Sequence, residues 1–158
     1  MKTALREESS TAETLNVYLT HLWGVGLLGY AYLPQDYGWV GVRDGIVVES
    51  QSLPGGSITD YNLGGTVVHE VGHWLGLLHT FEGGCAGGVD DLVEDTPRQD
   101  APTSGCPEGV DTCPDDPGED PIHNYMDYST DECYDQFSKG QRERMLDQWF
   151  AYRDGVAA

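Results

Sequence analysis

The sequence predicts a single α+β domain. A small mixed β-sheet and a helix above a cleft are followed by an irregular, disulfide-bonded lower half that ends in a C-terminal helix. Short runs of β-forming residues occupy the first third of the chain, and two later segments have the apolar spacing of helices. Between these segments lies a long stretch rich in glycine, aspartate and proline, which carries all four cysteines. The length of 158 residues is that of one domain with a substantial core.

The sheet is expected from three runs in the first half of the chain. Residues 15–19 alternate and are rich in β-forming side chains, and residues 27–33 are similar. Residues 45–49 form a short apolar run after an Asp-Gly turn, which is typical of a buried strand. We therefore expect an upper subdomain over residues 1–79 and a lower subdomain over residues 80–158.

The helix predicted for residues 64–78 carries a metal-binding pattern. His69 and His73 are four positions apart, so both imidazoles lie on one face of the helix. Gly76 can end the helix with a positive φ, and the resulting turn brings His79 towards the same point. Glu70 is offset by about 100° around the helix, which places it beside the ion rather than on it.

The spacing H-E-x-x-H-x-x-G-x-x-H therefore predicts a catalytic zinc site. Imidazole nitrogens are ligands that zinc prefers, and a set of three leaves one position open for water, as in catalytic rather than structural sites. Zn²⁺ would be held by His69, His73 and His79, and Glu70 would take the proton of the attacking water. The competing interpretation, a helix that carries histidines by chance, is disfavoured by the additional glycine and third histidine.

The stretch from residue 82 to residue 120 has little periodicity, and so long a loop inside a domain is normally functional or disordered. Disulfides would hold it, because an even number of cysteines without a C-x-x-C pair favours two bridges over a zinc site, with three pairings open. Calcium would also hold it, because this cation takes oxygen ligands from flexible loops. Our candidate ligands are Asp91, Asp95 and Thr96; the alternative is a solvated acidic loop.

The last predicted element is a helix over residues 139–152. Ser138 and Gln141 form the S-x-x-Q pattern of a capping box. An apolar stripe along this helix is expected to dock on the lower half as part of the core. The stripe consists of Met145, Leu146, Trp149 and Phe150.

Composition excludes several partners. Eight basic and 27 acidic residues give a formal net charge of −19, so nucleic acid and anionic membrane surfaces are unsuitable partners, whereas cationic substrates are attracted. There is no run of 18 apolar residues and no signal peptide within the chain. Disulfides require an oxidising compartment. We therefore expect a secreted monomer that acts on proteins or peptides and whose signal and any pro-segment lie outside this chain.

Three segments resemble the pappalysin family of metzincin zinc metallopeptidases, which includes ulilysin-like enzymes and secreted fungal metalloproteases. They are HTFEGGC at residues 79–85, DTP at residues 95–97 and DPIHNYMDY at residues 120–128. In metzincins the residue after the third histidine differs between families, and Thr80 followed by Phe81 is similar to the pappalysin pattern.

The resemblance extends from about residue 15 to about residue 145. It implies a metzincin fold and a zinc-dependent endopeptidase. Family domains usually carry a further helix and strand before the segment that resembles residues 1–19, for which this chain has no room, so we expect a short version or a fragment that lacks them. The resemblance also implies that a segment near residues 50–53 forms the edge strand along which substrate adds as an antiparallel strand.

Several site residues follow from the resemblance alone. Met126 matches the methionine of the turn beneath the three-histidine site. Tyr128 matches a tyrosine that in several metzincin families helps to hold the tetrahedral oxyanion. Glu132 matches an acidic residue that in ulilysin-like members lines the S1′ pocket and selects basic side chains after the cut. The alternatives are core packing for Met126 and Tyr128 and a solvated side chain for Glu132.

The resemblance also implies disulfides between Cys85 and Cys113 and between Cys106 and Cys133, and family members with calcium in this region favour the calcium site.

Two other functions remain open. One is a non-catalytic zinc-dependent peptide-binding module, against which Glu70 argues because a binder needs no base there. The other is a metzincin of another family with different pockets.

Overall fold

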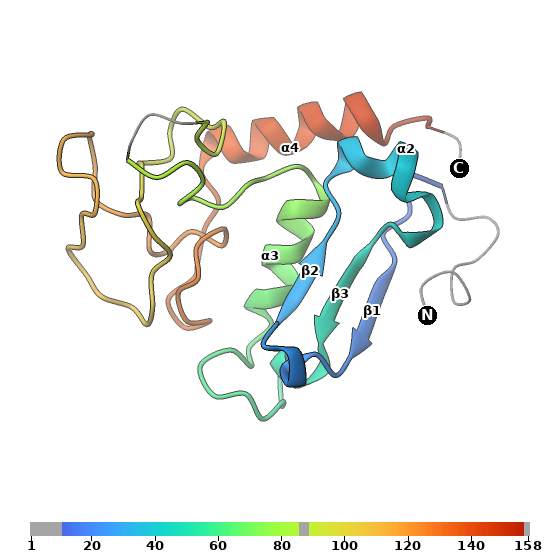
Figure 1. Cartoon of the computed structure of the whole chain (residues 1–158), viewed down its shortest axis with the longest axis horizontal. Coiled ribbons are helices and arrows are strands. Elements are labelled where there is room, and N and C mark those ends of the chain that lie inside the picture. The colour runs from blue at the N-terminus through green and yellow to red at the C-terminus, as the bar shows by residue number, and fades with distance from the viewer. Residues whose placement is uncertain (1–10, 86–88, 157–158) are drawn as a thin grey trace.

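The computed structural model describes residues 11–85 and 89–156. The three predicted strands form one mixed sheet, which confirms the α+β prediction (Figure 1). In this sheet β3 (Ile46–Glu49) is central, parallel to β1 (Val17–Thr20) and antiparallel to β2 (Gly29–Ala31). Because the order is β1-β3-β2, β2 forms an edge of the described sheet.

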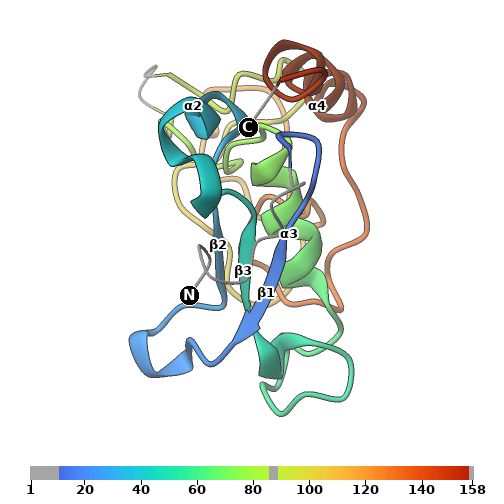
Figure 2. The same ribbon diagram turned by 90° about the vertical axis from the view of Figure 1, so that its right-hand side faces the viewer.

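The core lies between this sheet and α3 (Gly65–Trp74), which is the predicted metal-binding helix (Figure 2). Every residue of β3 is buried, which explains why its first three residues are apolar. Ile46 and Val48 point to the face that packs on Trp74 at the end of α3. Trp74 is 3% exposed, so it is a core residue.

Helix α3 ends at Trp74, four positions before the predicted end at residue 78. Gly76 adopts a φ of +97°, and its N–H donates to the carbonyl of His73 over 2.8 Å. The N–H of Leu77 donates to the carbonyl of Gly72 over 2.9 Å. These two bonds form a Schellman motif, which closes the helix because a glycine adopts the left-handed conformation without strain.

The prediction of an edge strand at residues 50–53 is wrong. This segment contains the short 3-10 helix η4 (Ser50–Ser52). A carboxylate oxygen of Glu49, at the end of β3, accepts a hydrogen bond from the N–H of Gln51 over 3.0 Å, and this local bond starts the helical turn in place of a strand. The edge strand that lines the cleft is β2 instead.

The connection from β2 to β3 is built from short helical segments, and a further one follows β1. They are η1 (Trp23–Val25), η2 (Pro34–Asp36), α2 (Tyr37–Val40) and η3 (Gly41–Arg43). The last three connect β2 to β3, which pair in antiparallel orientation.

The lower half contains little regular structure before its last helix, among the residues that the structure describes. Disulfides join Cys85 to Cys113 and Cys106 to Cys133, with Cα–Cα distances of 5.4 and 5.5 Å. These are the pairings that the resemblance implied. Each bridge restricts the unfolded chain and is worth about 3 kcal/mol in the chain-entropy view.

Helix α4 (Lys139–Tyr152) begins with the predicted capping box, in which Ser138 and Gln141 satisfy each other's backbone groups. The prediction that its apolar stripe docks on the lower half is wrong for its second part. Trp149 packs against Trp74 of the upper half, with ring centroids 6.0 Å apart. Leu146 and Phe150 are not core residues, since they are 58% and 66% exposed, and Met145 is half-buried. No helix among the described residues is long and apolar enough to cross a membrane.

Candidate active site

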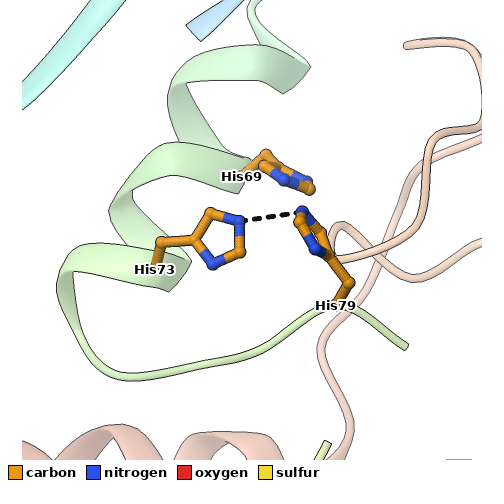
Figure 3. A group of neighbouring side chains, drawn as sticks. All are labelled: His69, His73 and His79. Carbon is orange, nitrogen blue, oxygen red and sulfur yellow. Dashed lines mark hydrogen bonds between the residues drawn. The ribbon is translucent and has the colours of Figure 1, made fainter. Parts of the chain in front are cut away.

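The three histidines of the metal-binding pattern meet at one point (Figure 3). His69 and His73 project from successive turns of α3, and His79 approaches them from the segment that follows the Schellman turn. The Nε2 atoms of His73 and His79 are 3.1 Å apart, and the ligand nitrogens of all three lie within 4.8 Å of one another.

Backbone carbonyls orient two of the rings. The Nδ1 atom of His69 is 2.6 Å from the carbonyl oxygen of Tyr125, and Nδ1 of His73 is 2.9 Å from that of Leu77. An N–H at each Nδ1 leaves the lone pair on Nε2, which faces the shared point. The Leu77 carbonyl is available because the Schellman turn folds it back under the helix.

All three imidazoles are neutral in this environment. Burial, reinforced by the proximity of the other two rings, lowers the pKa of His69 to about 3. Burial and His73 lower the pKa of His79 to about 4, and burial also lowers the pKa of His73. Neutral imidazoles with converging Nε2 lone pairs fit a zinc ion.

The third ligand is supported by an aromatic ring. Phe81 stacks on His79 with ring centroids 4.6 Å apart and planes inclined by 10°. It also meets Tyr128 edge to face at 5.0 Å. The sequence indicates this contact only through the position of Phe81, two residues after His79.

Glu70 lies beside the three histidines in the same cavity, which has a volume of about 450 Å³. Its side chain is 5% exposed, and its Oε2 atom has no hydrogen-bond partner among the described residues. Burial raises the pKa of this carboxyl to about 8. Tyr61, Tyr128 and Tyr134 line the cavity together with β2, so its walls are largely apolar.

Met126 lies beneath the histidines and is fully buried. Its sulfur atom occupies the space beside Gly72 of α3, where a Cβ atom would come within 2.5 Å of it. The carbonyl of Met126 accepts a hydrogen bond from the N–H of Thr80 over 3.2 Å, and the preceding carbonyl contacts His69. The turn thus supports the first and third candidate ligands at once.

The hydroxyl of Tyr128 is 3.2 Å from Nε2 of His79, and its side chain is 45% exposed. Burial of part of the ring, followed by the nearby Glu70 carboxylate, raises the pKa of this phenol. It therefore keeps its proton at neutral pH and is available as a hydrogen-bond donor into the cavity.

The expectation for Glu132 does not fit the structure, because this side chain is exposed and does not line the cavity. Its neighbour Asp131 is 8% exposed, and Oδ2 accepts hydrogen bonds from the N–H groups of Leu63 and Gly65. The carboxylate therefore caps α3 from the lower half. Its Oδ1 atom is buried without a hydrogen bond.

The three candidate calcium ligands do not act together. Both carboxylate oxygens of Asp95 are engaged at the start of α4, by the hydroxyl of Ser138 (2.7 Å) and the N–H of Gly140 (2.9 Å). By contrast, Asp91 Oδ2 and Thr96 Oγ1 are buried without a hydrogen bond of normal geometry. Burial raises the pKa of Asp91 to about 6, although the Thr96 hydroxyl is close enough to oppose this shift.

Another group with metal-ligating side chains in the described part of the chain is Cys106, His123 and Cys133. Its two sulfur atoms form a disulfide, so they are not available as thiolate ligands. The imidazole of His123 is hydrogen-bonded to the carbonyl of Cys133 over 2.7 Å. The three-histidine site is therefore the metal centre that the fold presents.

Comparison with known proteins gives the same answer. The chain matches the Peptidase_M43 family, described as pregnancy-associated plasma protein-A, over residues 6–149. It is 53% identical over 156 residues to an extracellular metalloprotease of Pyricularia oryzae, covering 98% of this chain and 54% of that protein. It is 52% identical over 158 residues to extracellular metalloprotease 1 of Coccidioides posadasii, covering 98% of this chain and 55% of that protein.

A solved structure, Tannerella forsythia mature mirolysin in complex with a cleaved peptide, superimposes with a TM-score of 0.80 at 36% identity. The match covers 88% of this chain and 53% of that one. The chain thus spans about half the length of the relatives it matches. With the zinc-binding geometry, the match along most of the sequence shows that this chain belongs to the pappalysin (Peptidase_M43) family of metzincin metallopeptidases.

Proposed function

We propose that the chain is the catalytic domain of a secreted zinc-dependent endopeptidase. The observation that carries this proposal is the convergence of three neutral imidazoles with Glu70 in one cavity beside an edge strand. An extended peptide that pairs with β2 would lie across this cavity, because an edge strand offers backbone hydrogen bonds to a further strand.

The residues of the site then have defined roles. Zn²⁺ held by His69, His73 and His79 would supply Lewis acidity for the scissile carbonyl and for the attacking water. A dication at the three histidines would favour the ionised form of Glu70, which accepts the proton of that water and delivers it to the leaving amine. Tyr128 donates a hydrogen bond to the carbonyl oxygen as negative charge develops there, and loss of one such donor typically costs about 10²–10³ in rate.

The test is hydrolysis of casein by the purified protein, with phenanthroline as inhibitor and with zinc content measured for each variant. Glu70→Gln keeps the shape of the side chain, so it should retain zinc and lose hydrolysis. Glu82→Gln is the control, because this exposed carboxylate lies close to the site without lining the cavity. Wild-type turnover in Glu70→Gln would contradict the mechanism, and zinc-dependent peptide binding without hydrolysis by wild type would support a binding module.

We also propose a preference for arginine or lysine after the cut, with Asp131 rather than Glu132 as its source. The unpaired Oδ1 atom of Asp131 is beside Gly65, next to the cavity wall formed by Tyr61 and Tyr134. Asp131→Asn keeps an acceptor for the cap of α3 and should weaken the selection of basic residues in a peptide library. Glu132→Gln should leave the selection unchanged, and a wild-type preference for apolar residues would refute the proposal.

Calcium is proposed as a stabilising cofactor, with Asp91 and Thr96 as ligands and without Asp95. The support is the pair of buried oxygen atoms, Asp91 Oδ2 and Thr96 Oγ1, which lie close together without a hydrogen bond of normal geometry and which a hard cation would satisfy. Added Ca²⁺ should raise the Tm of the chelator-treated protein, and more so above pH 6 because the cation competes with the Asp91 proton. Asp91→Asn should abolish this rise in Tm. Glu94→Gln, at an exposed position, is the control and should keep it. An unchanged wild-type Tm would count against the site.

Secretion is supported by the two disulfides and by relatives that are named extracellular metalloproteases. Protein recovered from an oxidising compartment should contain no thiol that reacts with Ellman's reagent after denaturation. Four reactive thiols per chain would contradict this proposal, since the disulfides account for all four cysteines.

A further inference from the structure

We infer that Gly29 is a positioning residue for catalysis: the absence of a side chain at this point of β2 creates the space in which the Glu70 carboxylate lies. The inference deepens the proposed endopeptidase function and rests on it. It concerns a residue outside the zinc-binding pattern, on a different element from the general base.

The register of the sheet shows why residue 29 faces the helix. Gly29 pairs with Val48 of β3, and Val48 belongs to the core cluster that packs on α3. Ala31 pairs with Ile46 on the same face of the sheet. Two small residues on the edge strand therefore allow α3 to approach β2 closely, which brings Glu70 against the strand.

The contact is too close for any side chain. A Cβ atom on Gly29 would lie 2.6 Å from Oε1 of Glu70, 2.7 Å from its Cγ and 2.9 Å from its Cδ. Real Cβ atoms essentially never approach other heavy atoms within 3.0 Å. Because the clash includes Cγ as well as the terminal oxygen, rotation of the carboxylate alone does not relieve it. The whole side chain of Glu70 has to move away from its place beside His69 and His73.

Packing against β2 positions the Glu70 carboxylate. Its Oε2 atom makes no hydrogen bond among the described residues, and its Oε1, Cγ and Cδ atoms lie against Gly29. A methyl group at residue 29 therefore separates two properties of the site. The histidines keep their backbone partners and still bind zinc, whereas the base is displaced from the proton that it has to accept.

The experiment is a double-mutant cycle of Gly29→Ala and Glu70→Ala, read by Tm, zinc content and kinetics on a peptide substrate. Gly29→Ala should bind one zinc per chain, keep KM within about twofold, and lose on the order of 10²-fold in kcat, since general-base catalysis is typically worth about 10²–10⁴. Its Tm should fall relative to wild type. The Tm cost should disappear in the Glu70→Ala background, because the clashing atoms are then absent.

Gly38→Ala is the matched control, because a Cβ atom there meets nothing within 4 Å. It should match wild type in every readout. A rise in KM with unchanged kcat in Gly29→Ala would overturn the inference, because the glycine would then only make room for substrate. A Tm cost that persists without the Glu70 side chain would overturn it as well, and the double variant provides this result even if Gly29→Ala alone folds poorly. An inactive wild type would refute the proposed function but leave the Tm cycle as a test of the contact.

Discussion

The side-chain amide of Gln99 donates a hydrogen bond to Oδ1 of Asp127 over 3.1 Å, across 28 positions of sequence, and both side chains are almost completely buried. The same amide accepts a hydrogen bond from the hydroxyl of Thr80 over 2.8 Å. Thr80 follows the ligand His79, and Asp127 precedes Tyr128 in the chain. One glutamine in the irregular lower half thus connects the segment of His79 to that of Tyr128, the proposed oxyanion donor.

Gln99→Met should therefore lower both stability and zinc affinity. The substitution keeps the approximate volume but leaves buried polar groups without partners, which should reduce the free energy of unfolding by about 2–3 kcal/mol. Urea unfolding and chelator competition measure the two effects. Gln35→Met on the surface should change stability by less than about 0.5 kcal/mol. Equal stability of the two variants would contradict the role assigned to this network.

Arg153→Met should be among the most destabilising single substitutions. The guanidinium is fully buried, pairs with Asp44 over 3.0 Å and lies 3.6 Å from the centre of the Trp74 ring. Removing it leaves the Asp44 carboxylate without its cation, which should cost about 3–5 kcal/mol in urea unfolding. The exposed pair of Lys139 and Glu143 is the comparison, and Lys139→Met should leave the stability almost unchanged because solvent screens this pair. Similar losses of unfolding free energy in Arg153→Met and Lys139→Met would contradict the idea that burial makes the Arg153–Asp44 pair the more important one.

Gly76→Ala should disturb the third ligand. Its φ of +97° is unfavourable for alanine, and a Cβ atom there would lie 2.5 Å from Cγ of Gln148 on α4. Relief of this strain opens the Schellman turn and moves His79, so zinc affinity should fall by about tenfold or more, given that one ligand contributes several kcal/mol. Gly24→Ala, at a position with open space, is the control. Unchanged affinity in Gly76→Ala would mean that the turn does not set the position of the ligand.

In the metal-free protein the histidine cluster should contribute stability that is lost as the pH falls below about 6.5. Glu70 and Asp91 contribute a slope of opposite sign, because burial raises their pKa values to about 8 and about 6 in the folded state. The folded-state pKa values of His69 (about 3) and His79 (about 4) lie below the ordinary histidine value of 6.5. At these two histidines the unfolded chain therefore binds more protons than the folded chain between pH 6.5 and pH 3. Their contribution to the free energy of unfolding is fully present above pH 6.5 and is lost as the pH falls. Each contributes a slope of up to about 1.4 kcal/mol per pH unit.

Urea unfolding of the metal-free protein between pH 7 and pH 4 measures this slope. His79→Gln should flatten this slope relative to wild type. The exposed His21→Gln serves as the control. A slope in His79→Gln equal to that of wild type would assign the acid sensitivity to carboxylates instead of the histidine cluster.

The sequence by itself predicted the cluster of three histidines, the position of Glu70 beside it and the helix that carries them. These features depend on residues close together in the chain: the i and i+4 positions of one helix, a glycine that ends it and a capping box. Helix geometry and glycine's access to positive φ are local properties, so spacing alone predicts where such side chains lie. The family resemblance added Met126, Tyr128 and the disulfide pairing.

Only the tertiary structure decided which distant segments meet at this site. The space that Gly29 leaves for Glu70, the Asp131 cap on α3 and the Arg153–Asp44 pair each join residues far apart in sequence. The predictions for Glu132, Asp95 and the apolar stripe of α4 were wrong for the same reason. Each depended on which distant residues these side chains contact in the folded chain. Close packing between elements has no signature in the spacing of either partner, because it depends on how two surfaces fit once the chain is folded.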